Sequence, residues 1–168
     1  CPFPPASGKI EIFSKKVYET ESRDYFPAIP RYVSPGEVPD DPLSGKYPLQ
    51  LMVWHTKRRC HSIHDNNKAM HAIDPQALHM HPRDAAARGI EDGDEAEVYN
   101  DRGRLRIPVR PTQRLMPGVT ALSQGAWYAP DADGTDRGGS INVLTSPHPT
   151  PYARGNPQHT NLVEVKKM

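Results

Sequence analysis

The sequence predicts a mainly β fold, a small barrel of short strands with few and short helices and a proline-rich N-terminal arm. Apolar and polar residues alternate over several short runs, which is the period of half-buried strands. The 168 residues include 19 prolines, and hydrophobic content is only 36%. This composition favours short strands with long connections over a layered arrangement of helices.

The N-terminal part is expected to hold one strand and a long irregular arm. Residues 8–13 alternate after a Ser-Gly turn and predict a half-buried strand. Residues 25–47 are dominated by Pro, Gly, Asp and Ser, and such long connections usually serve an interface. Apolar side chains that could pack this arm against a body are those of Tyr25, Phe26, Ile29, Tyr32 and Val33. We therefore divide the chain into a strand and arm over 1–46, joined to upstream domains, and a barrel domain over 47–168.

The middle of the chain supplies two strands and the clearest helix. Residues 47–54 form the most apolar run and predict a buried strand, and 77–81 predict another short one. A helix over 82–88 is expected because proline stands at its first position and Asp84 near the positive end of its dipole. Gly89 then supplies the left-handed residue that ends it.

The remaining strands follow in the second half. Residues 95–100 and 104–109 predict a hairpin whose turn places Gly103 where a left-handed residue is wanted. Pro108 favours an edge or a bulge in the second strand. Further strands are expected at 119–123, 141–145 and 162–166. The glycine- and aspartate-rich loop over 125–139, especially 131–139, is expected to be mobile.

Composition also excludes some classes of protein. A formal charge of +1 does not steer the chain toward nucleic acid or an anionic membrane. No apolar run is long enough to span a bilayer. Cys1 and Cys60 define no disulfide framework. The start of the chain lacks the features of a signal peptide and an initiator Met, so we expect a fragment of something longer.

Three polar clusters stand at predicted strand ends, over 55–62, 124–128 and 154–161. Their side chains would cost free energy if buried unpaired, so a ligand-facing position is favoured, with a solvated loop as the alternative. Asn and Gln amides suit the edge of a purine or pterin ring. The Arg and Lys residues of the first cluster suit a phosphate or pyrophosphate better than a polyanion.

The sequence carries binding chemistry without a visible nucleophile. It has no dinucleotide or Walker glycine loop and no Gly-x-Ser-x-Gly motif. Six of eight histidines lie between His55 and His81. His61 and His64 are three positions apart, but no second pair has matching spacing, so a zinc site is not favoured. His79 and His81 share one face of a predicted strand and could still bind a metal ion.

A series of motifs runs through the whole chain in order. They are 8–14, 47–62 with its His-x-x-x-Arg-x-His-Ser loop, 89–109, 117–119, 125–128, 142–145 and 155–161. In this order they resemble the last domain of molybdopterin oxidoreductases of the dimethyl sulfoxide reductase family. The resemblance implies a double-psi β-barrel that binds molybdopterin guanine dinucleotide, at the C-terminus of an enzyme reducing S-oxides or N-oxides such as dimethyl sulfoxide.

The same resemblance implies cofactors and partners. A bis(molybdopterin guanine dinucleotide) molybdenum cofactor (bis-MGD) would be shared with upstream domains of the same polypeptide, and an iron–sulfur cluster would lie only in the missing N-terminal part. No catalytic residue and no metal ligand is expected in this chain, which alone should be inactive. An iron–sulfur electron-transfer subunit and a membrane anchor subunit are implied, without nucleic acid or direct membrane insertion. The implied location is periplasmic, at the outer face of a bacterial cytoplasmic membrane.

Carried over residue by residue, the resemblance implies a set of cofactor-binding side chains and glycines. They are His55, Lys57, Arg59, His61, Ser62, Gln124, Gly125, Trp127, Asn142, Gly155, Asn156, Gln158, His159 and Asn161. Two alternatives stay open. One is a free-standing binding module for an anionic nucleotide-like ligand, without a catalytic role. The other is a structural zinc module.

Overall fold

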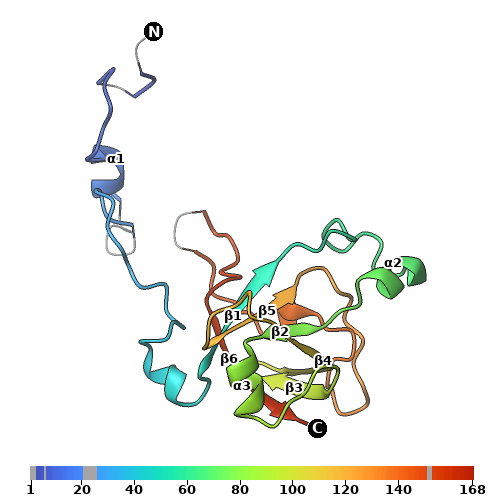
Figure 1. Ribbon diagram of the computed structural model, residues 1–168. Helices are drawn as coiled ribbons and strands as arrows, with labels where there is room; N and C mark the ends of the chain where they lie inside the picture. Colours follow the sequence, from blue (N-terminus) through green and yellow to red (C-terminus); the bar gives the residue numbers. More distant parts are fainter. Residues whose placement is uncertain (1–2, 6, 21–25, 151–152) are drawn as a thin grey trace.

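The computed structural model describes residues 3–5, 7–20, 26–150 and 153–168. Its centre is a closed barrel with the strand order β1-β5-β2-β4-β3-β6 (Figure 1). The strands are β1 Leu49–Trp54, β2 Leu78–Met80, β3 Glu95–Tyr99, β4 Arg104–Pro111, β5 Val119–Ser123 and β6 Asn161–Lys167. The predicted class is therefore confirmed: the fold is mainly β, with the closed six-stranded barrel of the double-psi type.

Strand directions place the polar loops on one side. β1 runs parallel to β5, and β2 runs parallel to β4. The other neighbouring pairs are antiparallel. Consequently β1, β3 and β5 end at the same rim of the barrel at which β2, β4 and β6 begin. We call this the upper rim, and the opposite one, which carries the chain's last residue, the lower rim.

The barrel interior is filled by alternate residues of the strands. In β1 the side chains of Leu49, Leu51 and Val53 are buried, while those between them are partly or fully exposed. Leu78 and Leu105 are fully buried from two other strands. Each such leucine contributes about 1.5–3 kcal/mol by leaving water, so the strands predicted from alternation are held by the core they form.

Short helices lie in the arm and between the strands. They are α1 Lys15–Tyr18, α2 Lys68–Ile73, α3 Pro82–Ala86, and the 3-10 turns η1 Pro42–Gly45 and η2 Ile141–Val143. The helix α3 confirms the predicted one, and Gly89 follows it with φ of 63°. His81 caps α3, because its Nδ1 accepts a hydrogen bond from Arg83 N at 3.1 Å. No helix of the described residues is long and apolar enough to cross a membrane.

Two predicted strands are wrong. Residues 8–13 form no strand, and Ile10 and Ile12 are each 74% exposed. Alternation makes a strand only where a neighbouring strand can pair with it, and the described residues supply none here. Residues 141–145 contain the turn η2, because Ile141 and Leu144, three positions apart, both bury their side chains.

Pro108 stands at a local edge, as expected, because β4 has a partner strand on one side only at this residue. The strand β4 lies between β2 and β3 in a closed barrel. Pro108 pairs with Glu95, the first residue of β3. Register with β2 begins only one residue later, at Val109. The missing N–H therefore falls outside the ladder between β2 and β4, and an interior strand accepts the proline.

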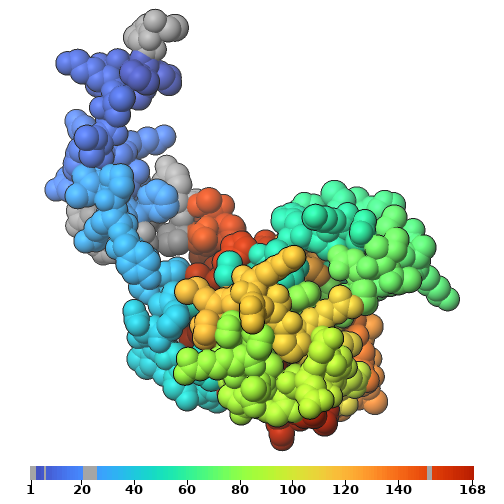
Figure 2. Space-filling view, in the orientation of Figure 1, coloured from blue at the N-terminus to red at the C-terminus, as the bar shows by residue number. Residues whose placement is uncertain are grey.

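The arm is irregular, as predicted, but most of it leaves the barrel. Figures 1 and 2 show the N-terminal residues running away from the barrel as a separate projection. Tyr32 is 79% exposed and Ile29 is 49% exposed, so the expected packing of these side chains on a body is absent among the described residues. Tyr25, which was part of the same expectation, lies outside the described residues.

Candidate functional site

The polar loops predicted to bind a ligand all leave the upper rim. The loop over 55–62 follows β1, and the loop over 124–139 follows β5. The segment over 140–160 leads into β6. The strand order makes β1 the neighbour of both β5 and β6. The structure therefore brings the three polar clusters of the sequence onto one end of the barrel.

The first two loops contact each other through side chains that were predicted as site residues. Gln124 Nε2 lies 2.8 Å from His61 Nδ1 and 3.1 Å from His55 Nδ1. The two imidazole rings meet edge to face, with centroids 5.1 Å apart. Trp127 Nε1 donates a hydrogen bond to the carbonyl oxygen of Ser62 at 2.8 Å. These residues form one half-exposed polar surface.

Gly125 is the point at which the two loops touch through their backbones. Its φ is 89°, and a Cβ added there would lie 1.8 Å from the carbonyl oxygen of His61. No side chain fits at this distance without moving the 55–62 loop. The glycine therefore shapes the surface, and its predicted place in the site rests on this close approach.

Arg59 has a supporting position in this surface. Its side chain and that of Asp65 are 6% and 8% exposed and form an ion pair. Arg59 Nη2 also donates to Gln76 Oε1, to Ser123 Oγ and to the carbonyl oxygen of Gln124, at 2.9, 3.0 and 3.1 Å. The two Nη atoms are thus occupied by the protein and hold the two loops together, while the buried Nε has no hydrogen-bond partner among the described residues.

Asn161 has a similar supporting position in the second half of the rim. It is fully buried, and its Oδ1 accepts from Ser146 N at 2.9 Å. Its Nδ2 donates to the carbonyl oxygens of Pro157 and Gln158 at 3.2 and 2.9 Å. The amide therefore fixes the turn that presents Gln158, and next to it His159 accepts from Val53 N at 3.4 Å through its Nδ1.

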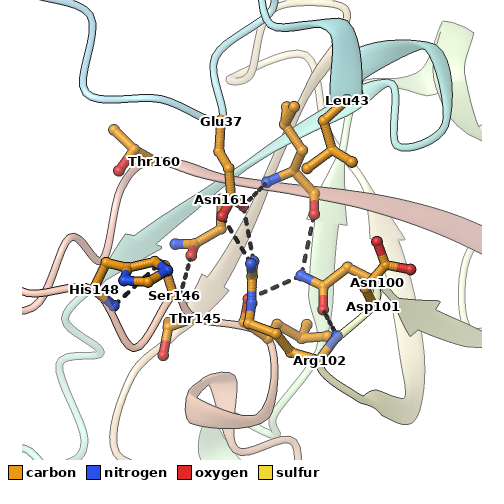
Figure 3. A network of polar contacts seen from close by, with 12 residues as sticks. Glu37, Leu43, Asn100, Asp101, Arg102, Thr145, Ser146, His148, Thr160 and Asn161 are labelled. Carbon is orange, nitrogen blue, oxygen red and sulfur yellow. Dashed lines mark hydrogen bonds and ion pairs between the residues drawn. The ribbon is translucent and has the colours of Figure 1, made fainter.

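A polar clasp, made of Glu37, Asn100 and Arg102, holds both ends of the 145–161 loop (Figure 3). Arg102 Nη1 and Nη2 lie 2.7 and 2.8 Å from the carboxylate oxygens of Glu37. At the start of the loop, Leu144 O accepts from Asn100 Nδ2 at 2.9 Å and from Arg102 Nη2 at 2.7 Å. At its end, Leu162 N donates to Glu37 Oε2 at 3.2 Å, and Leu162 O accepts from Asn100 Nδ2 at 3.2 Å.

The clasp was missed by the sequence analysis. Glu37 lies in the arm and Arg102 in a hairpin turn, 65 positions away. The one sequence signal for this clasp is the presence of polar residues in predicted turns, and polar residues are common in turns without any further role. No local pattern connects them.

The loop over 125–139 is fixed by one buried carboxylate. Asp136 is fully buried, and its Oδ1 accepts from Ala129 N at 2.8 Å and from Gly138 N at 3.0 Å. Its Oδ2 accepts from Ser140 N at 2.6 Å. Hydrogen bonds at both ends of the loop argue against the mobility expected of it, and of 131–139 in particular, without a bound ligand.

A cleft of about 790 Å³ opens beside the first loop and is lined by His55 and Lys57. The ring of Trp54 lies 4.7 Å from that of His79 and forms part of its wall. Burial, with a smaller contribution from the positive charge of Arg110, lowers the pKa of His79. The imidazole is therefore neutral at pH 7, and its buried Nδ1 has no hydrogen-bond partner among the described residues.

The charges of this cleft are mainly positive. Lys57, Arg110 and Arg114 line it, and none of them has an ion-pair partner in the described part of the chain. Asp74 and Asp92 lie on the same cleft. Unpaired cations beside aromatic rings suit an anion that carries a planar ring.

A second cleft of about 430 Å³ lies along the 145–161 loop. Three residues of the predicted site line it, Asn142, Gly155 and Asn156, together with Arg154. All four are exposed. The predicted residues thus divide into those that face a cleft or the open rim, and two, Arg59 and Asn161, whose polar atoms bind the protein itself.

The donor set suits a heteroaromatic ligand with phosphate groups. Amides, imidazoles, close glycine contacts and unpaired cations are the groups that recognise ring edges and phosphates. Among the described residues no group of three or more His, Cys, Asp or Glu could hold a metal ion. The rim can therefore orient a planar, negatively charged ligand through its own side chains.

Comparison with known families gives one match over most of the barrel. Residues 49–162 match the model of the molydopterin dinucleotide binding domain. A dimethyl sulfoxide reductase, DmsA, of Haemophilus influenzae is 46% identical over 99% of this chain and 22% of its own length. The DmsA of Escherichia coli K12 is 45% identical over 99% of this chain and 21% of its length. The chain thus spans about a fifth of the length of these relatives.

A solved structure shares the fold. Acetylene hydratase from Pelobacter acetylenicus superposes with a TM-score of 0.77 at 20% sequence identity. The match covers 96% of this chain and 24% of that one. Similarity at this identity concerns the fold alone.

Proposed function

This chain belongs to the molydopterin dinucleotide binding domain family, and on that premise we propose that it is the C-terminal cofactor-binding domain of a molybdenum oxidoreductase that reduces S-oxides or N-oxides. Relatives at 45–46% identity are named dimethyl sulfoxide reductases. A relative from Rhodobacter capsulatus, 39% identical, is named dimethyl sulfoxide/trimethylamine N-oxide reductase. The cofactor in this proposal is bis(molybdopterin guanine dinucleotide) with molybdenum.

One observation supports the proposal most. Three polar loops that are far apart in sequence meet on the upper rim, and the second cleft opens there beside Arg154. The first cleft begins at His55 and Lys57 on the same rim and extends to Arg110 and Arg114 near the lower-rim end of β4. A solvated loop cluster would not require the backbone contact between Gly125 and His61. The arrangement supports binding of an extended ligand with several polar groups.

Different residues would hold different parts of such a ligand. Lys57, with Arg110 and Arg114 beside it, would neutralise a pyrophosphate in the first cleft. Amides of Gln124, Asn142, Asn156 and Gln158 would face ring edges. Arg59 and Asn161 would keep the loops in place. When bound, the molybdenum cofactor supplies the oxygen-atom and electron transfer, while this chain orients it and limits the access of water.

The proposal extends to the rest of the protein. Residues 1–46 would join the barrel domain, 47–168, to upstream domains that hold the iron–sulfur cluster. The resemblance to the dimethyl sulfoxide reductase family adds three further parts to the proposal. They are an iron–sulfur electron-transfer subunit, a membrane anchor subunit, and a location in the periplasm or at the outer face of the cytoplasmic membrane. The small share of the relatives' length that this chain spans, 21–22%, supports the existence of further domains.

The test is cofactor analysis of the full-length protein, purified without oxygen. We expect molybdenum by mass spectrometry and guanine nucleotide after acid hydrolysis, together with reduction of dimethyl sulfoxide by a reduced dye. A Lys57→Gln/Asn156→Ala variant should lose most of both cofactor components. Lys9→Gln, which changes an exposed lysine of the arm, is the matched control and should retain them.

Two results would contradict the proposal. A full-length protein without molybdenum and guanine nucleotide, expressed in cells that make the cofactor, would favour the binding module for a nucleotide-like anion. Equal cofactor content in the double variant and the control would remove the upper rim from the binding site.

A further inference from the structure

The distal arm, residues 7–32, presents large apolar side chains to solvent. The most exposed are Tyr32 at 79%, Ile10 and Ile12 at 74% each, and Tyr18 at 54%. Soluble proteins seldom leave so many large apolar groups uncovered on one projection, and exposed apolar surfaces of this kind mark interaction sites. Figure 2 shows that the barrel does not cover this segment.

Hydrogen bonds and an ion pair attach the arm to the barrel at its base. Glu37 binds Arg102, and Tyr47 Oη donates to Asp101 Oδ1 at 2.7 Å, so the base is attached to the barrel. In the distal arm, Ser14 N donates to Ala28 O at 2.7 Å, and the ring of Phe13 lies 5.5 Å from that of Tyr18. These contacts hold the distal arm to itself. They leave its apolar side chains available to another surface.

Similarity to longer proteins includes the arm. The family match begins at residue 49, whereas the two DmsA proteins align over 99% of this chain. The fold match to acetylene hydratase covers 96% of the chain, a share that cannot be reached without most of residues 1–46. The match makes up 24% of the solved chain, so a similar fold is found there as one part of a longer polypeptide.

We infer that the distal arm is a docking segment whose partner is an apolar surface elsewhere in the same polypeptide. This inference rests on the proposed function in one respect, that this chain is part of a longer protein. The covering surface would bury the side chains of Ile12, Tyr18 and Tyr32. Through the clasp, it would also hold the base of the arm against the 145–161 loop of the upper rim.

The inference is tested by photo-cross-linking in the full-length protein. The variants Tyr32→p-benzoylphenylalanine and Ile12→p-benzoylphenylalanine place the reactive group on the distal arm. The matched control, Met116→p-benzoylphenylalanine, uses a side chain that is 69% exposed before β5, at the lower rim. Both arm variants should form cross-links within one polypeptide, to peptides outside these 168 residues, and the control should form far fewer.

Hydrogen exchange of the unlabelled full-length protein gives a second readout. Peptides over 10–18 and 26–33 should exchange on the order of 100-fold more slowly than an unstructured chain, because a covered segment exchanges only after local opening. Cross-links to a second copy or to another polypeptide would overturn the inference. So would fast exchange without cross-links. Molybdenum content of the same samples tests the proposed function separately, and either result can fail without the other.

Discussion

Glu37 and Arg102, 65 positions apart in the chain, form a two-point ion pair with nitrogen–oxygen distances of 2.7 and 2.8 Å. One partner lies in the arm and the other in the turn between β3 and β4. Because Glu37 also accepts from Leu162 N, the pair connects the arm to the start of β6. The position of the arm and the position of the 145–161 loop are thus linked by a single carboxylate.

Glu37→Gln should loosen the 145–161 loop. The neutral amide cannot pair with both guanidinium nitrogens, and loss of the partly exposed ion pair should cost about 1 kcal/mol. Hydrogen exchange should be faster at Leu162 and across the loop. Glu19→Gln, which removes an exposed pair with Lys15, is the control and should leave the loop unchanged. Equal exchange in both variants would show that the clasp does not hold the loop.

Gly125→Ala should displace the 55–62 loop and lower cofactor retention. The new methyl would lie 1.8 Å from the carbonyl oxygen of His61, and φ of 89° adds backbone strain of about 1–3 kcal/mol. The matched control is Gly118→Ala, with φ of 82° and no atom within 4 Å of the new methyl. Both variants should unfold more easily, but only Gly125→Ala should lose molybdenum and guanine nucleotide. Retention of both by Gly125→Ala would contradict the role of this contact.

Asn161→Ala and Asn156→Ala should distinguish a residue that stabilises the loop from one that contacts the cofactor. Removing the buried Asn161 amide takes the hydrogen-bond partner from Gln158 O and Ser146 N and leaves Pro157 O only its 3.4 Å bond from Thr160 Oγ1, which should cost on the order of 3 kcal/mol of the free energy of unfolding. Asn156 is exposed on the second cleft, so its loss should leave stability unchanged and reduce cofactor content. Thermal unfolding and guanine nucleotide analysis measure the two effects. A destabilised Asn156→Ala would reverse this assignment.

Acid should destabilise the barrel through His79. Burial lowers the pKa of this imidazole below 6.5, with the charge of Arg110 adding to the effect and the Ala77 backbone and then Asp74 opposing it. As pH falls below 6.5, the unfolded chain binds a proton that the folded protein does not. Stability should therefore fall from that pH down to the folded-state pKa. In His79→Gln this part of the pH dependence should vanish, and in Arg110→Gln it should shrink. Denaturant unfolding measured across this pH range, with proton NMR of the imidazole, checks both.

Much of the barrel could be predicted because its strands carry their own periodicity. The runs 95–100 and 104–109 contain β3 and most of β4, whose alternate burial leaves a regular pattern, and the apolar run 47–54 contains β1. Residues 8–13 show the limit, because Ile10 and Ile12 alternate without a neighbour to pair with. The strand order was not predictable, since β1 pairs in parallel with β5 some 70 positions later. Local propensity contains no information on such partners.

The candidate site was predictable in its exposed parts only. Amides and imidazoles clustered at strand ends, such as Gln124 and His61, are visible in sequence because they make poor core material. Whether a polar side chain faces outward depends on distant contacts. Arg59 and Asn161 bind loops of the protein itself, and Glu37 acts from a segment that looked like a connection. Such assignments need the fold.

The closed strand order has one more consequence. A barrel in which β1 pairs with both β5 and β6 has no unpaired strand edge among the residues that the structure describes. Another polypeptide cannot extend this sheet by adding a strand, which is the usual route of edge-to-edge association. Assembly with neighbouring domains or subunits must proceed through side chains, loops and the arm, and the barrel itself resists sheet-mediated aggregation.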